Sequence, residues 1–329
     1  MNRSYKKFYT TRGELIIRPY QDTDELAILK LFETVFKIKK ECKVWNWEFK
    51  GNPYGTQIML AFLEGQLVAQ CAAIPVRLYY RGASIKGAQL VDCMSHPKFR
   101  GIAFRKKGIF AITVQAFFDV FTGCDSNIYL FGFPGKRHYL LGKKLLGYSK
   151  THRVVEAVIF PSRRLVDPKR YLFKITRMEG EVSDDLLRKV SRKHRYPADL
   201  CVMKDFKYLK WRYIEIPHKS YNFLHIRKIT GKEAVCIIDE THEIPLLLDV
   251  VGNLHLRESL EVAAMFLNKP LKLWLPDRKD FLANLPEHHI TGPPGLEVIA
   301  VGRSFCEEVI TTRWANDNFF YSMGDSDLF

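Results

Sequence analysis

Four basic side chains lie in a short stretch of the chain that ends in a glycine. They are Arg100, Arg105, Lys106 and Lys107, and the glycine is Gly108. The apolar run at residues 88–94 predicts a buried strand before them, and residues 108–121 predict a helix after them. A loop between a strand and a helix presents backbone amides, and here basic side chains as well, to an anion. The stretch therefore predicts a site for a phosphorylated ligand.

The excess positive charge lies in the first half of the chain. The whole chain has 51 Lys and Arg against 36 Asp and Glu, a formal charge of +15. Residues 1–160 hold 25 of these basic residues and 12 of the acidic ones, and residues 161–329 hold 26 and 24. Such a one-sided excess favours a polyanionic partner, which could be a nucleotide-like cofactor, nucleic acid or an anionic surface. A general solubility bias would not by itself predict the uneven split.

Length and composition indicate a folded protein with two domains. The 329 residues are too many for one small core, and 47% hydrophobic with 26% charged residues is typical of soluble proteins. No run approaches the roughly 18 apolar residues of a membrane span, and no apolar secretory stretch follows the first residues. The 7 cysteines are scattered without a C-x-x-C pair. They predict reduced thiols in a cytoplasmic protein, with neither a disulfide framework nor a metal site.

Periodicity predicts alternating strands and helices in the first half. A strand at 15–19 precedes a helix that we expect to begin with a capping box at Asp22–Glu25 and to end near Phe36. Hairpin turns are expected at residues 64–66 and 81–83. Strands at 88–94 and 128–133 flank the helix at 108–121, as in a βαβ crossover. These two strands are therefore expected to be parallel neighbours.

The spacing W-x5-P occurs twice in the chain. Trp47 precedes Pro53, and Trp211 precedes Pro217, at an offset of 164 residues that is half the chain length. Each copy continues with a strand, a glycine turn and a second strand, so we predict two tandem copies of one fold. Their expected boundaries are residues 1–155 and 156–329. The second copy has only one Arg, next to a Glu, at residues 252–259, where the first has its basic loop, and is expected to have lost the ligand.

Longer motifs around the basic loop resemble the GNAT-type N-acetyltransferases, which use acetyl-coenzyme A. The stretch from Arg105 to Phe110 resembles the family's phosphate motif, R/Q-x-x-G-x-G/A, except that Phe110 replaces a small residue. The preceding His96-Pro-Lys-Phe-Arg-Gly101 resembles the H-P-x-Y/F-R-G that leads into it. The two pieces usually overlap, and here Ile102-Ala-Phe-Arg105 is inserted. The two copies resemble a bacterial subgroup with tandem domains. The implied fold is α/β (α+β): two tandem GNAT-like domains, each a mixed, mostly antiparallel twisted sheet flanked by helices.

This resemblance implies acetyl-coenzyme A as co-substrate, without a metal. Its pyrophosphate would meet the amides and basic groups of the loop, and its pantetheine arm would lie along the strand that ends in the loop. A backbone amide near Cys93 or Met94 would polarise the thioester carbonyl. The implied binding residues are Cys93, Met94, Ser95, Arg100, Arg105, Lys106, Lys107, Gly108, Ile109 and Phe110.

The implied reaction is direct attack of a primary amine on the thioester. Tyr139 is the first candidate, and Tyr148 the second, for the acid that protonates the leaving thiolate. Asp92 is a candidate base, although a carboxylate on a strand can equally hold a neighbouring amide. The terminal carboxylate of Phe329 is a further candidate, because it reaches the active site in some relatives. His96 is expected to fix the turn at Pro97.

Several alternatives stay open at this stage. The protein could bind acyl-coenzyme A without catalysis, bind nucleic acid through its basic half, or be a related aminoacyl transferase that uses charged tRNA. The absence of nucleic-acid-binding motifs argues against the second, and the phosphate motif against the third. Trp45, Trp47, Trp211 and Trp314 could line an acceptor pocket, but the recurrence of Trp47 as Trp211 favours core packing. The acceptor, and the choice between a monomer and a homodimer, are not readable from the sequence.

Overall fold

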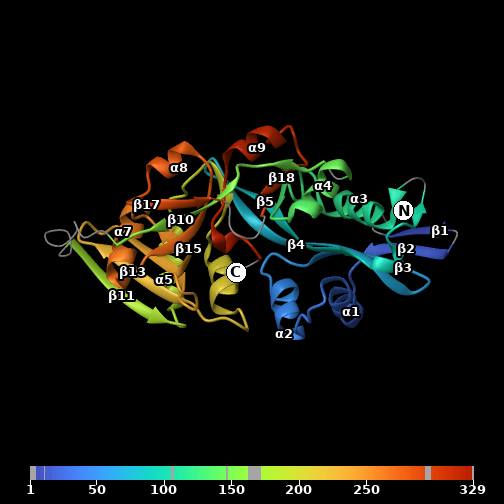
Figure 1. The fold of residues 1–329 in the computed structure, drawn as a ribbon, viewed down its shortest axis with the longest axis horizontal. Helices are drawn as coiled ribbons and strands as arrows, with labels where there is room; N and C mark the ends of the chain where they lie inside the picture. Colours follow the sequence, from blue (N-terminus) through green and yellow to red (C-terminus); the bar gives the residue numbers. More distant parts are fainter. Residues whose placement is uncertain are drawn as a thin grey trace. The chain divides into compact units, whose positions relative to one another are not determined.

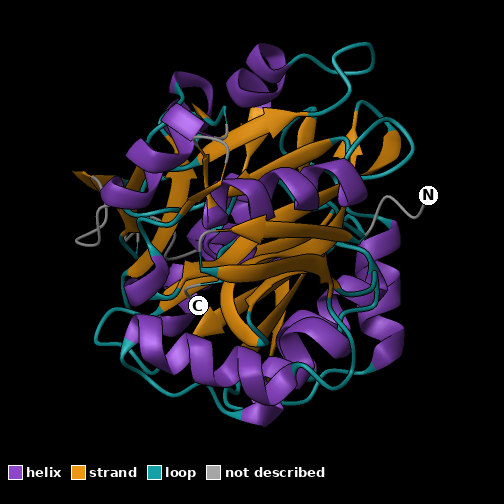
Figure 2. Ribbon diagram, turned by 90° about the vertical axis from the view of Figure 1, so that its right-hand side faces the viewer, coloured by secondary structure: helices purple, strands orange, loops and turns teal. Residues whose placement is uncertain are grey.

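The computed structural model describes residues 5–10, 12–104, 107–145, 147–161, 172–292 and 298–327. Strands form two large sheets with helices on their faces, which confirms the predicted mixed α/β fold (Figures 1 and 2). Two compact units can be distinguished. The first comprises residues 1–77, 85–149 and 301–316, and the second comprises residues 78–84, 150–300 and 317–329. None of the described helices is both long enough and apolar enough to cross a membrane.

The first sheet has the strand order β1-β2-β3-β4-β5-β8-β18-β9. Pairing is antiparallel from β1 to β4, parallel between β5 and β8, and antiparallel between β8 and β18. The parallel pair confirms the crossover predicted from the sequence. The strands are β1 (Lys6–Thr10), β2 (Gly13–Pro19), β3 (Gln57–Leu63), β4 (Gln66–Tyr80), β5 (Ala83–Ser95), β8 (Tyr129–Gly132), β18 (Val301–Ser304) and β9 (Ser149–Lys150).

Helices cover both faces of this sheet. In Figure 1 the strands β3 and β4 run between α1 and α2 on one side and α3 and α4 on the other. The helices are α1 (Glu25–Phe36), α2 (Cys42–Trp45), α3 (Ile109–Phe121), α4 (Lys136–Leu145) and α9 (Thr312–Asn318), with a π-helical turn, η1 (Asn46–Lys50), directly after α2. α3 buries Val114, Phe117 and Phe118, which follow one another at helical spacing.

Local signals in the first half are confirmed, with one correction. Both predicted hairpin turns place two consecutive residues at positive φ, Glu64 and Gly65 in one and Arg81 and Gly82 in the other. The predicted capping box is wrong in detail, because Asp24 is the N-cap of α1 and its side chain does not cap the helix. Its carboxylate instead accepts hydrogen bonds from both terminal guanidinium nitrogens of Arg18, at 2.7 and 2.8 Å. The forked guanidinium fits the two carboxylate oxygens closely.

The second sheet has the order β11-β13-β14-β15-β16-β10-β17. Its core contains fully buried aliphatic side chains from β10, β13, β14 and β16 and from helix α7. The strands are β10 (Val154–Ile159), β11 (Phe173–Glu179), β13 (Asn222–Lys228), β14 (Glu233–Asp239), β15 (Leu246–Gly252), β16 (Leu271–Pro276) and β17 (His288–Gly292). The helices of the second half are α5 (Asp184–Arg192), α6 (Phe206–Leu209), α7 (Leu256–Leu267) and α8 (Lys279–Ala283), with the π-helical turn η5 (Lys210–Ile214) and the 3-10 turn η6 (Met323–Asp325). Strand β12 (Leu200–Val202) pairs with β19 (Phe319–Phe320) and with the end of β4, residues 78–80.

The two sheets share one plan, and each takes a strand from the other half of the sequence. Along its main strand order each has a parallel pair, β5–β8 or β15–β16, next to an antiparallel strand; β12 and β19, which branch from β4, also pair parallel. That antiparallel strand is β18 in the first sheet, although it lies near the C-terminus, and β10 in the second. The compact units are therefore not contiguous, and the domain boundaries at residues 155 and 156 stay a prediction.

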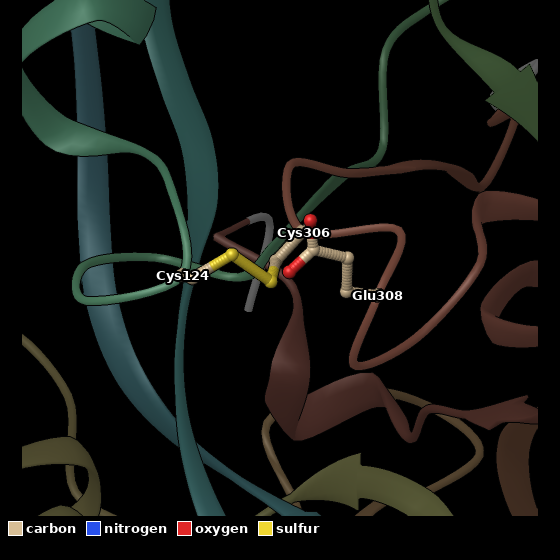
Figure 3. A group of neighbouring side chains, drawn as sticks. All are labelled: Cys124, Cys306 and Glu308. Atoms are coloured by element: carbon tan, nitrogen blue, oxygen red, sulfur yellow. A yellow bond between two sulfur atoms is a disulfide. The ribbon is translucent and has the colours of Figure 1, made fainter.

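A disulfide corrects the prediction that all cysteines are reduced. Cys124, after α3, is bonded to Cys306, after β18, and both belong to the first unit (Figure 3). Their sulfurs and the carboxylate of Glu308 form a group of metal-ligand type, but sulfurs bonded to each other are not thiolate ligands. Cys42, Cys71, Cys93, Cys201 and Cys236 are free thiols. The cytoplasmic location, which rested on reduced cysteines, stays a prediction.

We predict that Cys124→Ser lowers the free energy of unfolding by about 2–4 kcal/mol, because the disulfide closes a long loop in the unfolded chain. Denaturant titration in the absence of reductant measures this loss. Cys42→Ser, which removes an exposed free thiol, is the matched control. Equal stability of Cys124→Ser and the unmodified protein would show that the cross-link does not constrain the fold.

Candidate active site

A backbone irregularity marks the end of strand β5. Asp92 has φ +46°, a left-handed conformation that is uncommon for a residue with a side chain and unusual inside a strand. Its carbonyl accepts a hydrogen bond from Nε2 of the fully buried Gln70 on β4, at 3.2 Å. Parallel pairing with β8 involves residues 87–89, and β5 runs on to Ser95. Irregularities of this kind turn the following groups out of the regular ladder, and we expect this for the amides of Cys93 and Met94.

Lys40 holds the carboxylate of this irregular residue. Its Nζ lies 2.5 Å from the Asp92 carboxylate and 2.6 Å from that of Glu48 on η1. The three side chains are only 13%, 10% and 8% exposed. The ammonium also lies over the rings of Phe32 and Phe49, at 4.7 and 5.7 Å from their centroids. Burial alone would lower the pKa of Lys40, but the two carboxylates outweigh it and raise that pKa.

The same ion pair recurs in the second unit. Lys204, at the same 164-residue offset from Lys40 as Trp211 from Trp47, lies 2.8 Å from Asp249 on β15 and 2.6 Å from Asp325. Each lysine precedes a π-helical turn, η1 or η5, and each aspartate lies on the strand of the parallel pair. Recurrence in a unit without the basic loop favours a framework role for the pair. This argues for Asp92 as a positioning residue, and its role as base stays a prediction.

The turn after β5 is fixed by its own side chains. Nδ1 of His96 accepts a hydrogen bond from the amide of Lys98, at 3.2 Å, and Pro97 begins a 3-10 turn, η2 (Pro97–Phe99). His96 therefore fixes the turn at Pro97, as the sequence predicted. Arg100 is exposed, and its guanidinium donates to the carbonyl of Ser95 at 3.1 and 3.2 Å. Arg100 therefore ties the loop to the end of the strand.

The insertion between the two sequence motifs forms a small hairpin. Strands β6 (Ala103–Phe104) and β7 (Lys107–Gly108) pair antiparallel, and α3 begins directly after them with Gly108 as its N-cap. The backbone of Lys107 and Gly108 is therefore partly engaged. The first amides of α3, beginning with Ile109 and Phe110, have no acceptor within the helix, as at every helix start. Arg105, Lys106 and Phe329 lie outside the described residues.

A cluster of two thiols and a tyrosine adjoins the Asp92 irregularity. Sγ of Cys93 lies 3.7 Å from Sγ of Cys71, a fully buried residue on β4. Tyr148, after α4, interacts electrostatically with both thiols, and its ring packs where a Cβ on Gly142 would be. Burial raises the pKa values of Tyr148 and Cys71 well above their usual range. The sequence did not reveal Cys71, because residues 22 apart meet only when β4 and β5 pair.

The other candidates lie on α4 or in the core. Tyr139 is buried at 8% exposure on α4. His138 precedes it and faces Phe110 of α3, with ring centroids 6.2 Å apart, and burial lowers the pKa of His138. Trp45 is fully buried against Tyr20 and Phe49. Trp211 is buried at 2% exposure, which confirms its expected core packing.

A cavity lies in the second unit, between β15 and β16. These strands pair only at Leu246 and Lys272, and the walls of the cavity are mostly apolar. The ion pairs of Lys204 are part of its lining, and Ser322 donates to Asp249 at 2.7 Å. The strand β15 of the second sheet corresponds to β5 of the first. The cavity therefore lies at the position in the second sheet that corresponds to the end of β5. The loss of a ligand from this copy stays a prediction.

Comparison with known proteins identifies the first unit. Residues 16–118, which include β5, the loop and most of α3, match the family model described as an acetyltransferase (GNAT) domain. This part of the chain is therefore similar to a GNAT acetyltransferase domain. A search of curated proteins finds no sequence match to the chain.

Solved structures with a similar fold extend the GNAT likeness beyond this domain. One is an Enterococcus faecalis protein described as a probable N-acyltransferase (TM-score 0.67, 14% identity, 88% of this chain and 73% of that one). Another is a GCN5-related N-acetyltransferase from Anabaena variabilis (0.63, 11%, 88% and 73%). A third is a tandem GNAT protein from the clavulanic acid biosynthesis pathway (0.52, 10%, 88% and 98%). At these identities the likeness shows the fold alone.

We predict that Lys40→Met lowers the free energy of unfolding by about 3–5 kcal/mol, because two buried carboxylates lose their common counter-ion. Lys43→Met removes an exposed lysine whose partner Glu41 is also exposed and is expected to cost about 0–1 kcal/mol. Denaturant titration of both variants near neutral pH tests the difference. Similar small losses in both variants would contradict the framework role of Lys40.

Proposed function

We propose that the first unit transfers an acetyl group from acetyl-coenzyme A to a primary amine. The observation that carries the proposal is the order of features along one segment of a GNAT domain. The irregular residue Asp92 precedes the amides of Cys93 and Met94, and the chain then leads through the turn held by Arg100 to the start of α3. This order matches the donor. Amides near Asp92 would face the thioester carbonyl, the end of the strand would face the pantetheine arm, and the start of α3 would face the pyrophosphate.

In this proposal the donor is held mainly by the backbone. The amides of Ile109 and Phe110 at the start of α3 receive the pyrophosphate, and the basic side chains of the loop neutralise its charge. Arg100, Arg105, Lys106 and Lys107 are the residues proposed for this second task. The backbone from Asp92 to Ser95 receives the pantetheine arm.

In this proposal, groups around the end of β5 carry out the transfer of the acetyl group. An amide of Cys93 or Met94 stabilises the oxyanion that forms when the amine attacks the carbonyl. Attack breaks the carbon–sulfur bond, and the leaving thiolate takes a proton. We assign this step to Tyr148 before Tyr139, because burial raises the pKa of Tyr148 and keeps its hydroxyl protonated. Asp92 acts through the position of the backbone, and the carboxylate of Phe329 stays a sequence-based candidate.

Binding of coenzyme A is predicted to depend on Gly108. In the structure a Cβ at Gly108 meets nothing within 4 Å and φ is −70°, so a larger residue fits the fold. Gly108→Val should nevertheless weaken binding about tenfold to a hundredfold, since it blocks one or two hydrogen bonds to a charged group.

Titration calorimetry with coenzyme A measures this loss, with circular dichroism as the test of folding. Gly101→Val is the matched control, because Gly101 is also exposed in the loop and has open space around it. Unchanged affinity in Gly108→Val would overturn the proposed phosphate site. Tight binding with no thiol release across a broad panel of amines would instead indicate an acyl-coenzyme A-binding protein without catalysis.

Loss of the Tyr148 hydroxyl is predicted to slow the chemical step. With the best amine of that panel, Tyr148→Phe should lower kcat by about a hundredfold and leave the KM for acetyl-coenzyme A nearly unchanged. Tyr139→Phe, measured in parallel, should have the smaller effect. A larger loss in Tyr139→Phe would transfer the proton-donor role to Tyr139.

A further inference from the structure

The paired thiols of Cys71 and Cys93 lie where the proposed function puts the reactive thioester. Cys93 directly follows the irregular Asp92 and is only partly buried, whereas Cys71 is fully buried on the neighbouring strand. Covalent geometry keeps Sγ of a cysteine within about 4 Å of its own backbone nitrogen. A carbonyl bound to the amide of Cys93 or Met94 is therefore within close reach of the Cys93 sulfur.

The pair is arranged so that Cys93, the less buried member, can react. The two sulfurs lie 3.7 Å apart, close enough for one thiol to donate to the other. Burial raises the pKa of Cys71, so Cys71 keeps its proton and can donate it in a hydrogen bond to the thiolate of Cys93. A thiolate, not a thiol, is the nucleophile in exchange reactions. Tyr148, whose pKa burial raises, interacts electrostatically with both thiols.

From this geometry we propose that Cys93 is a self-acylation site, which takes the acyl group from bound acyl-coenzyme A when no amine is present. The inference rests on the proposed function, because it needs a bound acyl donor. The thiolate of Cys93 attacks the thioester carbon, a new carbon–sulfur bond forms, and the bond to the coenzyme A sulfur breaks. The proton that Cys93 released is taken up by the coenzyme A thiolate. The reactants are the acyl-coenzyme A thioester and the Cys93 thiol, and the products are the Cys93 thioester and free coenzyme A.

Two consequences distinguish this exchange from random modification. Reactant and product are both thioesters, so the reaction is readily reversible and excess free coenzyme A removes the acyl group. The acyl group on Cys93 also occupies the end of β5. We therefore expect the acylated protein to be inactive toward amines until coenzyme A reverses the exchange.

The test uses the full chain, treated with a reductant that carries no thiol and incubated with acetyl-coenzyme A without amine. Intact-mass and peptide mass spectrometry of the unmodified protein should find one acetyl group on Cys93, which hydroxylamine and excess coenzyme A both remove. Cys93→Ser should lose this adduct, and Cys71→Ala should form it about tenfold more slowly near neutral pH, because the thiolate loses its hydrogen-bond donor. Cys42→Ser, which removes an exposed cysteine elsewhere, should form it at the unmodified rate.

Binding of coenzyme A, measured separately, keeps the two proposals apart. Binding with no adduct on Cys93, or with adducts only on other residues, would overturn self-acylation and leave the proposed function standing. Absence of binding would overturn both. If Cys93→Ser fails to fold, protection of Cys93 from iodoacetamide by prior acetylation of the unmodified protein gives the same answer, and lack of protection overturns the proposal.

Discussion

The contact between Lys40 and Asp92 is the constraint on which the first unit depends. A residue with a side chain is held at positive φ inside a strand, which costs free energy that the surroundings must offset. Two contacts of Asp92 compensate this cost. Lys40 binds its side-chain carboxylate, and Gln70 donates a hydrogen bond to its backbone carbonyl. The bonded ammonium in turn ties the π-helical turn with Glu48 to the same strand. The position of the re-aimed amides is thus set by a buried charge network, not by the loop that would hold the ligand.

The second unit shows what remains of this plan without the basic loop. It keeps the lysine, the aspartate on the strand and the π-helical turn, but there Lys204 meets Asp325 from the end of the chain. Burial raises the pKa of Asp325, and the neighbouring Lys204 opposes this shift. The same framework therefore accompanies a loop rich in basic residues in one unit and a mostly apolar cavity in the other. Retention of the ion pair in both units marks it as a property of the fold.

Local patterns in the sequence predicted local structure well and long-range pairing poorly. The glycine turns, the helix at 109–121 and the parallel crossover follow from spacing and chain order, and the W-x5-P repeat predicted two similar halves. The contacts of Asp92 did not follow, because Lys40 lies 52 residues away and no periodicity links the two. The disulfide was missed for the same reason, since Cys124 and Cys306 are 182 residues apart and meet through the pairing of β8 with β18. Chemistry-bearing residues were recognised by motif, whereas their partners required the three-dimensional fold.

The origin of strand β18 constrains how the chain can be made. On the ribosome, β8 is synthesised long before residues 301–304, its antiparallel partner. Until those residues emerge, one edge of the first sheet lacks its strand, and an open edge is prone to pair with other chains. Nascent chains stalled before residue 301 should therefore need chaperones to stay monomeric. Evolution of this protein by loss or gain of one half is restricted for the same reason, because neither half encodes a complete sheet.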